Sequence, residues 1–306
     1  MSLSKPKAER LIDTALIKLL LQEQYSDLID LPIQFIDAGW DNVMYRLGDC
    51  LCLRLPRHQA AARLIEHEQT WLPKIAEHLT IPVPIPYRLG QPTVYYPWKW
   101  SILLWLAGVS GEREQPSADQ GKIFGAFLRS LHQPAPINAP FNPVRGVPLK
   151  QIAANLEARI SRVEPKIKSI SPKIKNIWYR ALDVPIDVSP KWLHGDLHPG
   201  NILIEDGEIV GVIDWGDITS GDIATDLAAV WMLFSDRNAR QQAITEYGQI
   251  SLATWQRAMG WAVYFGVTLL DIGLIDNPRQ ATIGERTLYC VAEDRFDSNT
   301  NNDSSK

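Results

Sequence analysis

The stretch WLHGDLHPGNILIEDGEIVGVIDWGD, residues 192–217, holds a strand hairpin and a group of oxygen-bearing side chains. Asp206 and Gly207 lie between two short apolar runs, which is typical of a tight hairpin turn. The hairpin predicts that Asn201, where the first strand opens, and Asp214, where the second strand closes, lie at the same end of the pair. Asp196 lies in the loop just before, so we expect these three side chains to converge.

The residue types at this end of the hairpin suit phosphoryl transfer. One amide and one carboxylate with open positions around them favour a magnesium ion that keeps waters and takes its other ligands from substrate phosphates. Asp196 is then free to orient or deprotonate an attacking hydroxyl. The order Asp-x-x-x-x-Asn followed by Asp-x-Gly is that of the kinase phosphoryl-transfer template.

The motif HGDLHPGN resembles the catalytic loop of the aminoglycoside phosphotransferase family, a form that macrolide phosphotransferases share. His194 and Gly195 stand with Asp196 where protein kinases have His-Arg-Asp, and Trp215 replaces the usual Phe of Asp-Phe-Gly. The resemblance spans residues 30–235. It implies an α+β, bilobal protein-kinase-like fold, with a small antiparallel-sheet N-terminal lobe and a larger, mainly helical C-terminal lobe.

The same resemblance implies roles for individual residues. Asp196 would be the catalytic residue, and Asn201 and Asp214 would be the magnesium ligands. His194 would support the catalytic loop structurally, and so would Asp226, from a segment that is similar to the family's Gly-Asp-Pro-x-x-Asp-Leu-Ala.

The nucleotide clamp is expected in the first lobe. Residues 39–42 lie between two expected strands, where kinases carry a glycine-rich phosphate loop. Arg54 occupies the position of the usual phosphate-binding Lys, and Glu68 on the next helix is its candidate ion-pair partner. Residues 104–106 stand where the hinge holds the base of ATP or GTP. The nucleotide-binding residues expected from these positions are Gly39, Trp40, Asp41, Asn42, Arg54, Glu68, Leu104, Trp105 and Leu106.

The pattern of apolar residues extends this organisation along the chain. We expect strands over 33–36, 43–47 and 51–55 and helices over 6–23 and 59–78. Further helices are predicted over 118–132, 149–163, 173–182, 222–235, 238–247, 252–272 and 283–293. The predicted nucleotide-binding lobe is 1–105, with its N-terminal helix. The helical lobe with the catalytic loop and acceptor site is 106–297, and the tail over 298–306 is predicted to be disordered.

The amino-acid composition argues against two classes of protein, nucleic-acid binders and membrane-spanning proteins. The 306 residues include 45% hydrophobic and 22% charged residues with a net charge of −4, which describes a globular chain without the basic excess of a nucleic-acid binder. The apolar run 258–270 ends at Asp271, short of a membrane span. We therefore expect no nucleic-acid or membrane partner and a cytoplasmic location. The three cysteines are expected to be buried thiols, and Asp217 an exposed carboxylate.

Several classes of acceptor alcohol, and both ATP and GTP as the donor, are compatible with the sequence. An excess of acidic residues after position 217 would suit a cationic acceptor such as an aminoglycoside. The apolar helix over 259–270 could instead line a macrolide-like pocket, and ordinary metabolites are equally compatible. A zinc site at His194 and His198 is disfavoured, because glycine and proline break the helix it would need.

The leading hypothesis is a magnesium-dependent small-molecule kinase that uses ATP or GTP. The alternative is a catalytically impaired, nucleotide-binding regulatory protein, favoured only by Arg54 in place of Lys. Protein kinase activity is not expected, because little chain separates Asp214 from Asp226. A metal-dependent hydrolase lacks a ligand set.

Overall fold

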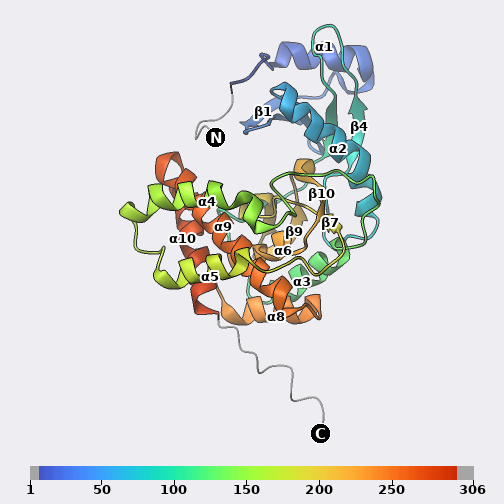
Figure 1. The fold of residues 1–306 in the computed structure, drawn as a ribbon. Helices are drawn as coiled ribbons and strands as arrows, with labels where there is room; N and C mark the ends of the chain where they lie inside the picture. Colours follow the sequence, from blue (N-terminus) through green and yellow to red (C-terminus); the bar gives the residue numbers. More distant parts are fainter. Residues whose placement is uncertain (1–6, 295–306) are drawn as a thin grey trace.

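The computed structural model describes residues 7–294, which form a strand-rich N-terminal lobe and a helical C-terminal lobe (Figure 1). The N-terminal lobe is built on an antiparallel sheet of five strands in the order β1-β2-β3-β5-β4. The three predicted strands are all present, and two further strands follow them in the chain. The strands are β1 (Ile33–Ala38), β2 (Asn42–Leu47), β3 (Leu51–Pro56), β4 (Pro86–Gly90) and β5 (Trp100–Leu104).

Two helices flank this sheet. Helix α1 (Thr14–Gln24) packs its buried Ile17, Leu20 and Leu21 against the residues of β2 and β3 that share one face of the sheet. Helix α2 (Gln59–Ala76) lies at the opposite face, where Gln69 Nε2 donates to Ser101 Oγ at 3.0 Å. Helix α1 begins later than predicted because the Asp13 carboxylate caps it, accepting from the Leu16 backbone N–H at 2.8 Å.

The C-terminal lobe packs around one long helix, α9. Its most apolar stretch is long enough to cross a membrane, but 78% of that stretch is buried inside the fold, as in a core helix. The expected helix over 222–235 is instead two short helices that meet at Ala228. The helices are α3 (Gln120–Leu131), α4 (Leu149–Val163), α5 (Pro172–Leu182), α6 (Ala224–Leu227), α7 (Ala229–Leu233), α8 (Arg237–Tyr247), α9 (Leu252–Asp276) and α10 (Pro278–Glu293).

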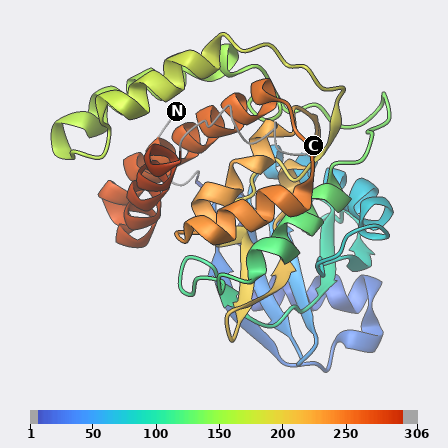
Figure 2. The same cartoon turned by 90° about the horizontal axis from the view of Figure 1, so that it is seen from below.

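The predicted hairpin is present as β8 (Ile202–Glu205) and β9 (Glu208–Val212), with φ of 51° at Asp206 and 80° at Gly207. These positive angles at both turn positions match the twist of a two-residue hairpin. The short strand β6 (Val109–Ser110) pairs with β8, and β7 (Lys191–Leu193) pairs with β10 (Thr219–Gly221). In Figure 1, β7, β9 and β10 lie between the first lobe and helix α3 of the second, and Figure 2 gives the same arrangement turned by 90°.

Only two of the three cysteines are buried, although all three were expected to be. Cys52 and Cys290 are buried, but Cys50 is exposed because it lies at the turn between β2 and β3. The predicted tail over 298–306, and residue 6 of the first predicted helix, lie outside the described residues.

Candidate active site

The loop that follows β7 is held in place by a buried carboxylate from α6. Asp226 accepts from the backbone N–H of His194 at 2.7 Å and of Gly195 at 3.0 Å, and its side chain is fully buried. Gly195 has a φ of 85°, which a side chain would oppose. Asp226 therefore fixes the direction in which the loop leaves the strand.

The His194 ring ties this loop to the end of β9. Its Nε2 lies 3.0 Å from the Ile213 carbonyl oxygen, and its Nδ1 accepts from the Asp196 backbone N–H at 3.2 Å. Nε2 must therefore carry the proton. Burial lowers the pKa of His194, which keeps the ring neutral. A neutral ring with both nitrogens engaged acts as a brace for Asp196.

The hairpin brings Asn201 and Asp214 together, as expected. The Ile213 backbone N–H donates to the Asn201 carbonyl oxygen at 2.9 Å, and Asn201 Nδ2 donates to the Asp196 carbonyl oxygen at 2.9 Å. The amide is thereby oriented by its nitrogen, which leaves its oxygen for a ligand. The Asp214 side chain is 52% exposed, and its backbone is left-handed with a φ of 64°. Strained backbone of this kind is frequent at functional sites.

Arg54 reaches this site from β3. Its Nη1 lies 3.0 Å from Glu68 Oε2 and its Nη2 contacts Asp214 Oδ1. With the Asn42 amide oxygen turned toward it, Nε and Nη2 also donate to Asn42 at 3.2 and 3.1 Å. Burial opposes the charge, but Glu68 and Asp214 together raise the pKa of Arg54. The guanidinium thus links the sheet, α2 and the end of β9.

Residues 39–42 form a turn between β1 and β2 that is tied to the start of α2. The Gly39 N–H donates to the Asn42 carbonyl oxygen at 2.9 Å, and Arg57 Nη1 donates to the Gly39 carbonyl oxygen at 2.5 Å. Asp41 Oδ1 lies 3.5 Å from His58 Nε2. Burial, followed by the charge of Asp214, raises the pKa of Asp41. Trp40 is exposed at the tip.

Two groups that the sequence did not single out as site residues surround the Asp196 carboxylate. Arg145 Nη2 lies 3.0 Å from Asp196 Oδ1, and His198 Nε2 lies 3.6 Å from Asp196 Oδ2. Burial alone would raise the pKa of Asp196, but the hydrogen bond from His198 and the charge of Arg145 lower it overall. No motif marks Arg145, because it comes from a loop 51 residues earlier in the chain.

Asp217 is not the exposed carboxylate that was expected. It is half-buried, and its Oδ1 accepts from Asn142 Nδ2 at 2.8 Å. Burial, followed by the nearby charge of Asp196, raises the pKa of Asp217 to about 6. It belongs to the acidic cluster around the catalytic loop.

The expected hinge follows β5. The Trp105 backbone N–H donates to the Cys50 carbonyl oxygen at 2.8 Å, so this donor is already engaged. Its indole ring lies 4.0 Å from Arg46 Cζ. Leu104 is exposed at the end of β5, and Leu106 lies against Gly211 of β9.

Comparison with known proteins gives one family and one fold. Residues 32–261 match the phosphotransferase enzyme family, abbreviated APH. A thiamine kinase of Shigella sonnei (strain Ss046) is 28% identical over 116 residues, which cover 37% of this chain and 39% of that protein. An aminoglycoside 3'-phosphotransferase of Escherichia coli is 25% identical over 122 residues, covering 39% of this chain and 45% of that protein. The matched region thus spans less than half the length of these relatives.

Solved structures agree over nearly the whole chain. The GDP and kanamycin complex of APH(2")-IIia has a TM-score of 0.66 at 16% identity, covering 91% of this chain and 98% of that one. The macrolide 2'-phosphotransferase MphH of Brachybacterium faecium has a TM-score of 0.57 at 18% identity, covering 92% and 99%. At these identities the likeness concerns the fold, and it confirms the predicted kinase-like α+β architecture.

Proposed function

Because the chain belongs to the phosphotransferase enzyme family, we propose that it is a magnesium-dependent kinase of a small-molecule alcohol. ATP or GTP would be the donor, and its γ-phosphoryl group would be transferred. The observation that carries the proposal is the convergence of Asp196, Asn201 and Asp214 at one end of the β8–β9 hairpin, with the Arg54–Glu68 pair contacting the same end. The solved neighbours that are complexes with GDP, ADP or ATP support a nucleotide donor.

The phosphates would be held from the N-terminal lobe. The Arg54 guanidinium presents a fork of donors that suits phosphate oxygens, and Glu68 fixes its direction. The turn over 39–42 would cover the phosphates, and residues 104–106 would receive the base. Since the Trp105 N–H is engaged with Cys50, the base would have to use other main-chain groups there.

The chemistry of Asn201 and Asp214 fits magnesium. The described residues contain no cluster of three or more His, Cys, Asp or Glu side chains suited to a metal. An amide oxygen with one carboxylate is nonetheless a suitable partial set, because magnesium takes its remaining ligands from water and phosphates. When bound, the ion would neutralise charge on the phosphates during transfer.

Asp196 would receive the acceptor hydroxyl. One carboxylate oxygen would accept its hydrogen bond and direct the hydroxyl oxygen toward the γ-phosphorus. That oxygen forms the new bond to phosphorus, the bond from phosphorus to the bridging oxygen breaks, and the hydroxyl proton is released. Because Arg145 and His198 lower the pKa of Asp196, its main contribution would be orientation of the hydroxyl.

Under this proposal each lobe has its own role, and the protein is placed in the cytoplasm. Residues 1–105 would bind the nucleotide, and residues 106–297 would carry the catalytic loop and the acceptor site. An enzyme that consumes nucleoside triphosphate would work in the cytoplasm, where that donor is present.

The test is magnesium-dependent turnover of ATP and GTP with a panel of alcohols. Asp196→Ala should lower kcat by about 10²-fold or more. Asp183→Ala is the matched control, because that carboxylate is 77% exposed and, within residues 7–294, its one ion pair is with Lys150 at the surface. An Asp196→Ala variant with full activity would refute the assignment.

The same assay addresses the regulatory alternative. The contact of Arg54 with Asp214 favours that alternative, because it engages a predicted metal ligand. Nucleotide binding without turnover on any acceptor would support it.

A further inference from the structure

Asp226, which holds the catalytic loop, is a fully buried carboxylate with no lysine or arginine partner within residues 7–294. Asp222, four residues earlier, is instead paired with Arg257 Nε at 2.6 Å. The two oxygens of Asp226 accept from the backbone N–H groups of His194 and Gly195. Burying a carboxylate is costly unless hydrogen donors surround it. Any further group that directs a hydrogen toward Asp226 therefore helps to fix its position.

His132 faces this carboxylate from the C-terminal end of α3. Its side chain is 2% exposed, and its Nε2 lies 3.6 Å from Asp226 Oδ2. Among the described residues, Nε2 has no hydrogen-bond partner. A bare Nε2 would set its lone pair against the carboxylate oxygen, so the geometry favours a proton on Nε2. At 3.6 Å the attraction is electrostatic rather than a full hydrogen bond.

Tyr247 on α8 engages the other nitrogen of the same ring. Its hydroxyl lies 2.9 Å from His132 Nδ1. With the ring proton on Nε2, Nδ1 is an acceptor, and the hydroxyl donates to it. Burial, followed by the charges of Asp226 and Asp222, raises the pKa of Tyr247, so the phenol keeps the proton that it donates. A hydroxyl, an imidazole and a carboxylate thus form a chain from α8 to the catalytic loop.

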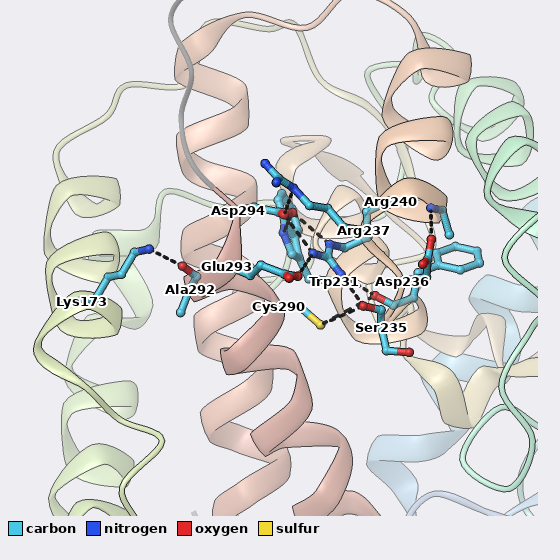
Figure 3. Close-up of polar contacts among 12 residues, drawn as sticks. Lys173, Trp231, Ser235, Asp236, Arg237, Arg240, Cys290, Ala292, Glu293 and Asp294 are labelled. Atoms are coloured by element: carbon cyan, nitrogen blue, oxygen red, sulfur yellow. Dashed lines mark hydrogen bonds and ion pairs between the residues drawn. The ribbon is translucent and has the colours of Figure 1, made fainter.

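Helix α8 is fixed along its length, which keeps the Tyr247 hydroxyl in place. Figure 3 shows its first turn, where the buried Arg240 donates to two carboxylates at the end of α10, at 2.7 and 2.9 Å. Farther along, Gly125 of α3 allows the two helix backbones to approach closely. A Cβ at that position would lie 2.2 Å from the Ala243 carbonyl oxygen. Tyr247 follows one turn later, and its ring contacts the His132 ring edge to face, with centroids 5.5 Å apart.

We propose that Tyr247 and His132 are positioning residues for phosphoryl transfer: the hydroxyl selects the tautomer of the imidazole, and the imidazole holds Asp226 where it orients the catalytic loop. The inference rests on the proposed function, because it takes this loop as the one that carries the catalytic Asp196. Neither side chain contacts a residue predicted to bind nucleotide or metal. Their loss should therefore lower kcat and leave the KM for nucleotide unchanged.

The test uses Tyr247→Phe, which removes the hydroxyl and keeps the ring contact. NMR of wild type labelled with 15N-histidine should show His132 protonated on Nε2 and bare on Nδ1. The His194 and Gly195 amides should exchange with solvent about threefold to tenfold faster in the variant, as expected for one lost hydrogen bond. Amides of β2 and β3 should exchange as in wild type. Hydrolysis of magnesium ATP by water, which needs no acceptor, should lose kcat by a similar factor, with KM within about twofold.

Two further comparisons separate position from packing. His132→Gln keeps an N–H donor near the place of Nε2, so it should retain more of kcat than His132→Leu. Tyr289→Phe is the matched control, because it removes a hydroxyl from a side chain on α10 that is 69% exposed, and it should match wild type.

Three results would overturn the inference: a proton on His132 Nδ1 in wild type, unchanged exchange of the two loop amides in Tyr247→Phe, or exchange that rises equally throughout the protein. Unchanged kcat in Tyr247→Phe would overturn it as well. The NMR and exchange measurements need no turnover. The proposed function therefore fails separately, through full activity of Asp196→Ala.

Discussion

The ion pair between Arg54 and Glu68 gives a quantitative prediction. The Glu68 side chain is fully buried and that of Arg54 is 5% exposed, with 3.0 Å between Nη1 and Oε2. Breaking a buried ion pair by removing one partner costs about 3–5 kcal/mol. Arg54 keeps its contacts with Asp214 and Asn42, so we expect Glu68→Ala to lower the free energy of unfolding by about 3 kcal/mol, at the low end of that range.

Urea unfolding at pH 7 measures this loss. With a slope of about 2–3 kcal/mol per molar urea, the midpoint should fall by roughly 1 M. Glu66→Ala is the matched control, because Glu66 is exposed on the same helix, and it should stay within about 0.5 kcal/mol of wild type.

A double variant separates stability from function. Arg54→Met with Glu68→Leu replaces the pair by apolar side chains, and it should recover to within about 1 kcal/mol of wild type. It should still lose affinity for the magnesium–nucleotide complex. The reasoning would be refuted if Glu68→Ala were as stable as wild type, or if the double variant were no more stable than the single one.

Three further predictions concern the loop and the hairpin. The pKa of Asp217 is raised from 3.8 to about 6, so wild type loses stability as the pH rises from about 4 to about 6 and stays at the lower value above that; Asp217→Asn should gain stability over wild type across this window, reaching about 2 kcal/mol in urea unfolding at pH 7. A variant no more stable at pH 7 would contradict this sign. Asp226→Asn retains only one acceptor oxygen for the two buried N–H groups, so it should lose about 2–3 kcal/mol and also kcat, measured by unfolding and turnover. Gly207→Ala, with a φ of 80° and a Cβ 2.2 Å from Ser117 Oγ, should cost more than Gly248→Ala, which has a φ of 105° and no neighbour within 4 Å; equal losses would mean that the contact adds nothing.

The site residues whose arrangement the sequence predicted lie close to one another along the chain. Asp196, Asn201 and Asp214 lie in one short stretch, and the Asp206–Gly207 turn sets the register that joins their ends. Glu68 was predicted as the partner of Arg54 because it lies on the helix that directly follows the Arg54 strand, and the structure places Nη1 and Oε2 3.0 Å apart. In each case the spacing along the chain limits the arrangement.

The remaining features depend on contacts between distant segments. Arg145 meets Asp196 only because the α3–α4 loop folds back over the catalytic loop, and neither segment carries a spacing signal for the other. Strand β4 was not predicted, because its proline-rich surroundings hide an edge strand that pairs only with β5. Counts of acidic residues likewise do not show that Asp222 and Asp271 are paired internally.

The contact between Arg54 and Asp214 has a consequence for ligand selection. Arg54 contacts two carboxylates, those of Glu68 and Asp214, so under the proposed function a phosphate that bound Arg54 would have to displace Asp214. Inorganic phosphate or a metal-free nucleotide would bind Arg54 and leave the negative charge of Asp214 without a cationic partner. If Arg54 binds phosphate and Asp214 binds the metal, as proposed, a nucleotide with its own divalent cation would supply a partner to both groups at once. The site would thus discriminate between metal-loaded and metal-free nucleotide by exchanging partners, with no change in shape required.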